Sequence, residues 1–282
     1  MQPIKRFQVR GAPGEVVRIQ LCDRYVDYWA PPEPTTHLIV AHDGQIIFDK
    51  STSTYGQIWK LAKSATKVFK NHGFAPPLII GVFHSSSATN PGGRAKDLAP
   101  QDIFQNGVTP RENFPGIWPT PERKFPISEL RGNRYQADIV ESIIPTITSA
   151  VGHTLNPANT AMLGASMGGL ATLYGVSKYP EIYRTALAFS THWSVGMDPL
   201  VSELMASLPP AGTHKLWMSR GTKALDAGYG PYQEYANNIA VSRGYRYGRD
   251  LATPVYQRTT HNEKSWSSYV TQALEFWISD RN

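Results

Sequence analysis

The 282-residue sequence predicts an α/β protein with a mostly parallel central sheet and helices on both faces. Short runs of consecutive apolar residues, such as 37–41 and 77–83, are typical of strands that are buried on both sides. Segments whose apolar residues recur at helical spacing, such as 57–72, alternate with these runs. We therefore expect a functional site at the carboxyl ends of the strands.

The remaining elements follow the same alternation in chain order, and the whole chain, 1–282, is interpreted as one domain. The strands expected are residues 16–21, 25–29, 37–41, 77–83, 161–163, 184–190, 215–219 and 254–258. The helices expected are residues 57–72, 135–151 with a bend at Pro145, the segment after Ser166, 199–208, 231–243 and 265–278.

Residues 84–134 interrupt this alternation. Ser, Gly, Asn and Pro dominate the segment, which is too rich in helix breakers for a helix and too long for a plain connection. We expect a Pro-rich lid or rim over the site. Phe114, Trp118 and Phe125 are expected to form a wall for an acyl or aryl group.

Composition excludes several classes of function. The net charge is +6, but the basic residues are scattered, so no nucleic-acid partner is expected. Cys22 is the only cysteine, which excludes an intramolecular disulfide and suggests a buried apolar residue. No apolar run has the length of a membrane span, and no signal peptide opens the given chain, so a cytoplasmic location is expected. Neither metal-ligand spacing nor a phosphate-binding Gly loop occurs, so we expect no metal or cofactor.

The sequence GASMG at 164–168 matches the pattern G-x-S-x-G between a predicted strand and a predicted helix. In that context the serine lies on a tight turn with its hydroxyl above the sheet, and small neighbours are required. Ser166 is therefore the predicted nucleophile. Its oxyanion donors would be the backbone N–H of Met167, at the helix start, and a second amide from 84–87, for which we take His84.

A serine hydroxyl needs a histidine base and an acid that orients the base. His261 follows the predicted strand 254–258 and is the expected base. His214 precedes a strand and so belongs at the opposite edge, and His192 is expected to line the pocket. Asp226, in the loop after strand 215–219, is the expected acid, with capping of the next helix as its other interpretation.

Other acidic residues are weaker candidates. Asp198 would come from an earlier loop, Glu203 and Glu234 from solvated helix faces, and Asp250 from an exposed charge-rich turn. Asp43, in the sequence Asp-Gly-Gln at a predicted strand end, admits a metal-binding or catalytic interpretation.

Four segments in this order and spacing carry a family resemblance: HDGQIIFD (42–49), GRAKDLAP (93–100), GASMGGLATLYGVSKYPEIY (164–183) and HNEKSW (261–266). From about residue 24 to its C-terminus the chain resembles the Putative esterase family, the esterase D and enterochelin esterase group of α/β-hydrolases.

The resemblance implies an α/β-hydrolase fold with Ser166 as nucleophile, His261 as base and Asp226 as acid. The usual family acid stands nearer the glycine, at positions occupied here by 222–223, and some members use a serine–histidine pair with little help from an acid. The resemblance also suggests an ion pair between Arg94 and Asp97 at the cleft rim. For Asp43 it implies a structural turn near the site, with the carboxylate bonded to backbone N–H groups, and we expect this role instead of a metal-binding or catalytic one.

The expected function is a serine hydrolase that cleaves small-molecule carboxylic esters through an acyl-enzyme. One alternative is an acyltransferase of the mycolyltransferase type, in which a sugar hydroxyl replaces water. Another is a non-catalytic binding module on the same fold. The sequence indicates neither the ester nor the oligomeric state.

Overall fold

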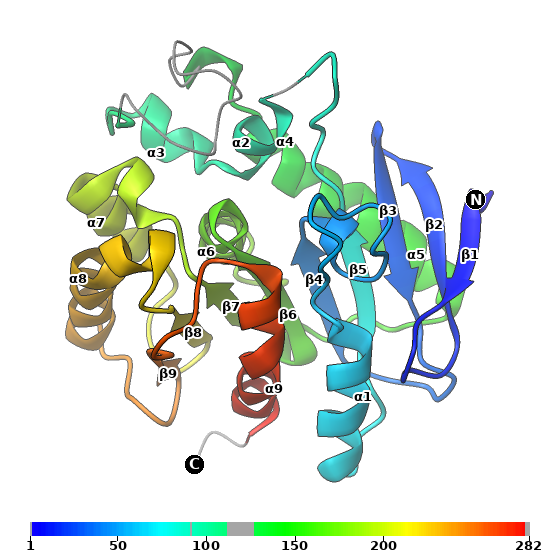
Figure 1. Ribbon diagram of the computed structural model, residues 1–282. Coiled ribbons are helices and arrows are strands. Elements are labelled where there is room, and N and C mark those ends of the chain that lie inside the picture. The colour runs from blue at the N-terminus through cyan, green and yellow to red at the C-terminus, as the bar shows by residue number, and fades with distance from the viewer. Residues whose placement is uncertain (1, 91, 112–126, 280–282) are drawn as a thin grey trace.

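The structure is a computed structural model that describes residues 2–90, 92–111 and 127–279. Within these ranges nine strands form one sheet in the order β1-β2-β3-β5-β4-β6-β7-β8-β9 (Figure 1). The strands are β1 (Lys5–Gln8), β2 (Glu15–Leu21), β3 (Arg24–Trp29), β4 (Leu38–His42), β5 (Leu78–Val82), β6 (Thr160–Ala165), β7 (Thr185–Phe189), β8 (Lys215–Ser219) and β9 (Leu251–Ala252).

Strand directions divide the sheet into two parts. The pairs among β1, β2, β3 and β5 are antiparallel, whereas β5, β4, β6, β7, β8 and β9 run parallel to one another. Right-handed crossover helices connect parallel strands, so helices are expected on the sheet faces. The predicted α/β fold with a mostly parallel sheet is thereby confirmed.

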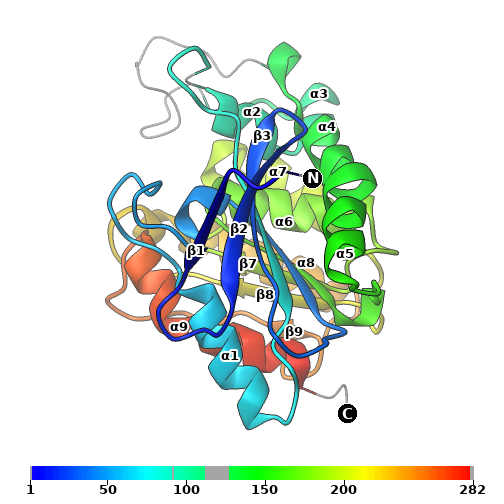
Figure 2. The same ribbon diagram turned by 90° about the vertical axis from the view of Figure 1, so that its right-hand side faces the viewer.

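Helices cover both faces of the sheet (Figures 1 and 2). The helices are α1 (Leu61–Asn71), α2 (Gly93–Leu98), α3 (Gln101–Gln105), α4 (Gly132–Ala137), α5 (Ile144–Val151), α6 (Met167–Lys178), α7 (Met197–Ser207), α8 (Gly230–Ser242) and α9 (Glu263–Ile278). On one face α1 and α9 pack side by side, and on the other α5 to α8 contribute to a second apolar layer. No helix in the described part of the chain is both long and apolar enough to cross a membrane.

Successive side chains of the central strands point alternately into the two apolar layers, one on each face of the sheet. In β4, Leu38 and Val40 contact the layer of α5 to α8, whereas Ile39 and Ala41 contact the layer of α1 and α9. Successive side chains of a strand point to opposite faces, so a strand buried on both sides must be apolar throughout. This explains why the continuous apolar runs predicted these strands.

Several polar residues follow the carboxyl ends of the parallel strands. Four strands are followed by polar residues: β4 by Asp43, β5 by His84 after Phe83, β6 by Ser166 and β7 by Ser190. The loop after β8 contains Asp226. Because these strands run in the same direction, their carboxyl ends meet at the same side of the sheet.

The expectation that 84–134 contains no helix is wrong. Short helices α2 and α3 lie between residues 93 and 105, and α4 begins at Gly132. The breakers set the helix limits instead of preventing helices, since Gly92 and Pro100 occupy the positions just before α2 and α3. Residues 112–126, with Phe114, Trp118 and Phe125, lie outside the described residues, and the expected lid remains a prediction.

Two further elements differ from expectation because of proline. The expected helix 135–151 is divided into α4, a π-helical turn over Asp138–Ile143, and α5 with Pro145 in its first turn. A proline has no N–H for the preceding turn, and the wider turn accommodates it. The expected strand 254–258 is only a bridge between Arg220 and Val255, because Pro254 cannot donate to a ladder.

Two residues also differ from expectation in burial. Asp250 was expected at the surface, but it is 1% exposed and accepts backbone N–H bonds from Arg246 at 2.6 Å and Gly212 at 3.2 Å. Cys22 is half-buried, with φ of 52°, in the two-residue turn between β2 and β3. Both central residues of that turn have positive φ, as tight hairpins require.

A buried lysine closes the end of α9. Lys215 is 2% exposed, and its Nζ donates to the backbone oxygens of Phe276 at 2.9 Å, Trp277 at 3.2 Å and Ser279 at 2.5 Å. We predict that Lys215→Met lowers the free energy of unfolding by about 2 kcal/mol or more, because these carbonyls lose a charged donor. Urea denaturation measures the change, and Lys223→Met, at an exposed site, should leave stability within about 0.5 kcal/mol.

His42 is 1% exposed and hydrogen-bonded to the Tyr135 hydroxyl. Because its ring is buried, we expect the stability of the folded chain to depend on pH. Desolvation lowers the pKa of His42 from 6.5 to about 4. The unfolded chain therefore binds a proton that the folded chain excludes, and stability present above pH 6.5 is lost as the pH falls toward 4.

We predict that His42 by itself lowers the free energy of unfolding by about 2 kcal/mol when the pH falls from 8 to 5. Urea denaturation at each pH should show a smaller loss for His42→Gln and an unchanged loss for His72→Gln, which alters an exposed histidine. Equal pH slopes in wild type and His42→Gln would contradict the prediction.

Candidate functional site

Ser166 occupies the sharp turn between β6 and α6. Its backbone is strained, with φ of 60° and ψ of −122°. The turn is held by its backbone N–H, which donates to Phe189 at 2.9 Å, and by its carbonyl, which accepts from His192 at 3.2 Å. A Cβ on Gly164 would lie 2.4 Å from the carbonyl oxygen of Gly168, so only glycine fits there. The pattern G-x-S-x-G thus reflects a steric requirement of the turn.

The structure brings His261 and Asp226 together. The distance from His261 Nδ1 to Asp226 Oδ1 is 2.6 Å, and Asp226 is fully buried. The second carboxylate oxygen, Oδ2, accepts from the Gly221 N–H and from the Ser190 hydroxyl, each at 2.7 Å. Because an ionised carboxylate only accepts, Nδ1 of His261 carries the proton and Nε2 is left as the basic nitrogen.

Two supporting residues extend this network. The Trp266 indole Nε1 donates to the Ser190 hydroxyl at 3.0 Å, and the Trp266 ring lies edge-on to His261 with centroids 5.1 Å apart. Ser190 was missed in the sequence. Its only signal was its place directly after a strand predicted to end at the functional edge. Ser190 has φ of 43°, which shows that the turn after β7 is also constrained.

A second histidine lies beside His261. His192 is 2% exposed, its Nδ1 is hydrogen-bonded to the Tyr229 hydroxyl, and its ring centroid is 6.4 Å from that of His261. Burial, followed by the nearby His261 and Arg94, lowers the pKa of His192 well below 6.5. The ring is therefore neutral near pH 7 and adds no positive charge next to His261.

Asp43 forms an ion pair that differs from the expected contacts. Within the described residues its carboxylate accepts no backbone N–H; it accepts hydrogen bonds from Nε and Nη2 of Arg94, each at 2.7 Å. Burial opposes ionisation of Asp43, but Arg94 outweighs this effect and lowers the pKa of the carboxyl below its usual range. A Cβ on Gly168 would lie 3.2 Å from Asp43 Oδ2, so the pair packs against the first turn of α6.

The predicted ion pair between Arg94 and Asp97 is also wrong. Asp97 is 1% exposed and contacts Arg24 at 3.1 Å and Arg131 at 3.5 Å. It also accepts the backbone N–H of Ser85 at 2.7 Å. Asp97 therefore anchors the loop after β5 instead of neutralising Arg94.

That loop holds the candidate second oxyanion donor. The backbone N–H groups of Ser85, Ser86 and Ser87 donate to Asp97, His84 Nδ1 and the Asn90 carbonyl. Among the four residues 84–87, only His84 donates its backbone N–H to no acceptor in the described part of the chain. Met167 is the first residue of α6, so its N–H lacks an acceptor within the helix.

The other candidate residues lie elsewhere. Asp198, Glu203 and Glu234 are exposed, and His214 at the start of β8 contacts the Pro180 carbonyl at 2.9 Å. Ser166 Oγ makes no hydrogen bond to His261 within residues 2–90, 92–111 and 127–279. Over those same ranges no group of three or more His, Cys, Asp or Glu side chains could hold a metal ion.

Comparison with solved structures finds the same fold at low sequence identity. The enterobactin esterase FES from Shigella flexneri superposes with a TM-score of 0.64 and 14% identity, over 96% of this chain and 61% of that one. The enterobactin and salmochelin hydrolase IroE superposes with a TM-score of 0.61 and 17% identity, over 94% of each chain. At these identities the comparison identifies the fold alone.

Sequence comparison adds a relative and a family. The uncharacterized protein YbbA of Bacillus subtilis (strain 168) is 31% identical over 158 residues, which are 54% of this chain and 61% of that protein. The chain thus spans about three fifths of the length of YbbA and of FES. The model of the Putative esterase family matches residues 117–275, more than half of the chain, and includes Ser166, Asp226 and His261. The chain belongs to the Putative esterase family.

Proposed function

We propose that this chain is a carboxylic ester hydrolase with Ser166 as nucleophile, His261 as general base and Asp226 as the orienting acid. The observation that carries the proposal is the 2.6 Å contact between His261 Nδ1 and buried Asp226, at the sheet edge where Ser166 occupies a strained turn. Membership of the Putative esterase family supports the same reaction. Ser166 directly follows β6, Asp226 lies in the loop after β8, and His261 lies between the bridge at Val255 and α9, which is the chain order serine, acid, histidine of this chemistry.

In the proposed reaction His261 Nε2 takes the proton of Ser166 Oγ as the oxygen attacks the ester carbonyl carbon. The C–O bond to the alcohol then breaks, and the alcohol leaves with that proton. Water, deprotonated by the same nitrogen, attacks the acyl-enzyme and releases the acid. Asp226 stays ionised throughout and stabilises the protonated imidazole.

The tetrahedral oxyanion is assigned to the backbone N–H groups of Met167 and His84. Met167 adds the positive end of α6, and His84 has the one amide among residues 84–87 that donates to no acceptor in the described part of the chain. Donors that are already fixed in place need no reorganisation when charge develops on the oxygen.

The reaction also requires that Ser166 Oγ and His261 Nε2 approach each other, since no hydrogen bond joins them in the described residues. Catalytic hydrogen bonds are commonly long without substrate and tighten when it binds. The His261 ring is fixed at Nδ1 and against Trp266, so rotation of the serine hydroxyl is the simpler adjustment.

A panel of esters would identify the substrate. FES and IroE are described as acting on enterobactin, so that ester belongs in the panel beside aryl esters, acetylated sugars and thioesters. Trehalose added as an acceptor separates hydrolysis from acyl transfer, because a transferase forms a new sugar ester.

We predict that a fluorophosphonate probe labels the wild-type protein and not Ser166→Ala, because only an activated serine attacks the phosphorus. Ser166→Ala and His261→Gln should each lower kcat on the best ester by at least about 10³-fold. Asp226→Asn should lower it by about 10²- to 10⁴-fold, since the imidazole loses its orienting acceptor. Intact-mass spectrometry and initial rates measure these effects.

Ser268→Ala is the matched control, because Ser268 is exposed on α9 and its hydroxyl donates to the carbonyl of Ser265 in the preceding turn. It should label and turn over like the wild type. A folded wild-type protein that takes up no probe would contradict the proposal and favour a binding module.

We also predict that Ser190→Ala lowers kcat by about tenfold with little change in KM, because Asp226 loses one of the donors that hold it in the position where it orients His261. The variant removes one donor to Asp226 and leaves the buried Trp266 N–H without its acceptor. A carboxylate with one donor fewer stabilises the protonated imidazole more, so the acid limb of the pH–rate profile should move to higher pH.

Trp266→Phe is the companion variant, since it keeps a smaller aromatic ring beside His261 and removes the indole N–H that donates to Ser190. It should shift the acid limb in the same direction by a smaller amount. A loss of kcat in Ser190→Ala with an unmoved pH profile would assign Ser190 a packing role alone.

A further inference from the structure

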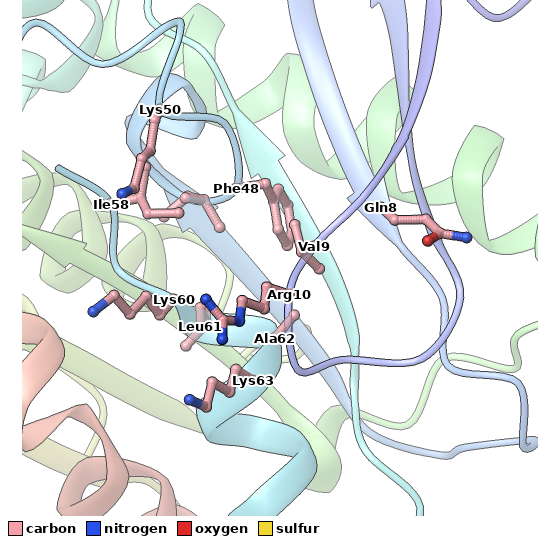
Figure 3. Close-up of a pocket in the computed structure, with 11 residues that line it drawn as sticks. Gln8, Val9, Arg10, Phe48, Lys50, Ile58, Lys60, Leu61, Ala62 and Lys63 are labelled. Carbon is pink, nitrogen blue, oxygen red and sulfur yellow. The ribbon is translucent and has the colours of Figure 1, made fainter. Parts of the chain in front are cut away.

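A cavity of about 490 Å³ lies away from Ser166, between the N-terminal segment, the loop after β4 and the start of α1 (Figure 3). Its floor is apolar and includes Ile47, Phe48 and Leu61, which are all buried. The volume is within the usual range for sites of small organic ligands. None of the residues that line it belongs to the proposed catalytic machinery.

The polar part of this cavity is strongly basic. Arg10, Lys50, Lys60 and Lys63 line it, and its lining contains no aspartate or glutamate. Figure 3 shows the charged ends of these four side chains gathered on one side of the cavity, with the Phe48 ring facing it and the Gln8 side chain directed away. A Cβ on Gly11 would lie 3.0 Å from Cδ of Lys63, so the stem of that lysine packs against the N-terminal loop.

No acidic side chain that the structure describes forms an ion pair with these four cations. The nearby carboxylate of Asp49 is already engaged by Lys5 at 2.8 Å and lies 3.5 Å from Arg18. Four uncompensated like charges around one apolar cavity repel each other, and an anion there would remove that repulsion.

The N-terminal end of α1 adds to the positive electrostatic potential that the four cations produce in the cavity. The first turn contains no acidic residue, and Lys60, the residue before it, makes no side-chain cap. Cations next to the positive end of a helix are unfavourable on their own, whereas an anion at that place interacts with both.

We propose that this cavity binds a phosphate monoester whose organic part is apolar, with the phosphate between the four cations and the organic part against Phe48. A phosphate carries close to two negative charges at neutral pH and accepts hydrogen bonds in several directions, which suits flexible lysines as well as an arginine. Such a group occurs in free alkyl or aryl phosphates and in the headgroup of phosphatidic acid. The proposal is independent of the ester hydrolysis proposed above.

The test is a calorimetric titration with phenyl phosphate, inorganic phosphate and phenol, on protein whose nucleophile is first blocked by fluorophosphonate or replaced in Ser166→Ala. We expect phenyl phosphate to bind more tightly than inorganic phosphate, and phenol to bind least. Lys60→Glu/Lys63→Glu should weaken phenyl phosphate at least about tenfold, because two charged contacts are reversed.

Lys67→Glu/Lys70→Glu is the matched control. Both of these lysines are exposed on α1 but do not line the cavity, and the change in net charge is identical. This variant should bind phenyl phosphate like the parent. Equal weakening in the two double variants would overturn the proposal, because the effect would then come from overall charge.

Sedimentation with phosphatidylcholine vesicles that contain phosphatidic acid distinguishes the two sources of the ligand. Vesicle binding that Lys60→Glu/Lys63→Glu abolishes and Lys67→Glu/Lys70→Glu preserves would assign the cavity to a lipid headgroup, and binding of phenyl phosphate alone would assign it to a free ester. Failure of both phenyl phosphate and the vesicles to bind would overturn the proposal. Thermal unfolding of each variant checks that the fold is retained.

Discussion

The close approach of β6 and α6 at Gly164 and Gly168 is the constraint on which the site depends. With a Cβ at Gly164 only 2.4 Å from the Gly168 carbonyl, any larger residue would push the helix away from the strand. The strain at Ser166, with φ of 60°, persists because both neighbours of the turn are buried between packed elements. The same geometry that costs conformational energy places the serine at the start of α6.

The parallel register then determines which residues meet Ser166. β6, β7 and β8 are adjacent and end at one edge, so Ser166, Ser190 and Asp226 lie close although they are far apart in sequence. The acid is held by three donors, from His261, Gly221 and Ser190, and Trp266 fixes Ser190 in turn. Buried polar networks of this kind hold one geometry when every member is satisfied.

The positive charge of Arg94 is neutralised by an acidic partner, whereas within the described residues the positive charges around the cavity of Figure 3 are not. Arg94 is paired through both of its nitrogens with Asp43, which positions its guanidinium beside the first turn of α6. Arg10, Lys50, Lys60 and Lys63 have no such acidic partner within the described residues. Arg94 is thus neutralised by its partner next to the proposed site, whereas the four cations around the cavity produce the positive potential on which the proposed phosphate site rests.

The sequence by itself determined the α/β architecture and the candidate residues Ser166, His261 and Asp226, because apolar runs, glycine spacing and strand order are local or sequential signals. The tertiary structure alone decided that Arg94 contacts Asp43, that Asp250 is buried, and that Ser190 joins Asp226 to Trp266. These contacts join elements distant in the chain, and side-chain partners across such distances depend on packing. The proline effects at 145 and 254 lie between the two, since sequence locates the break but the packed neighbours decide what replaces the regular element.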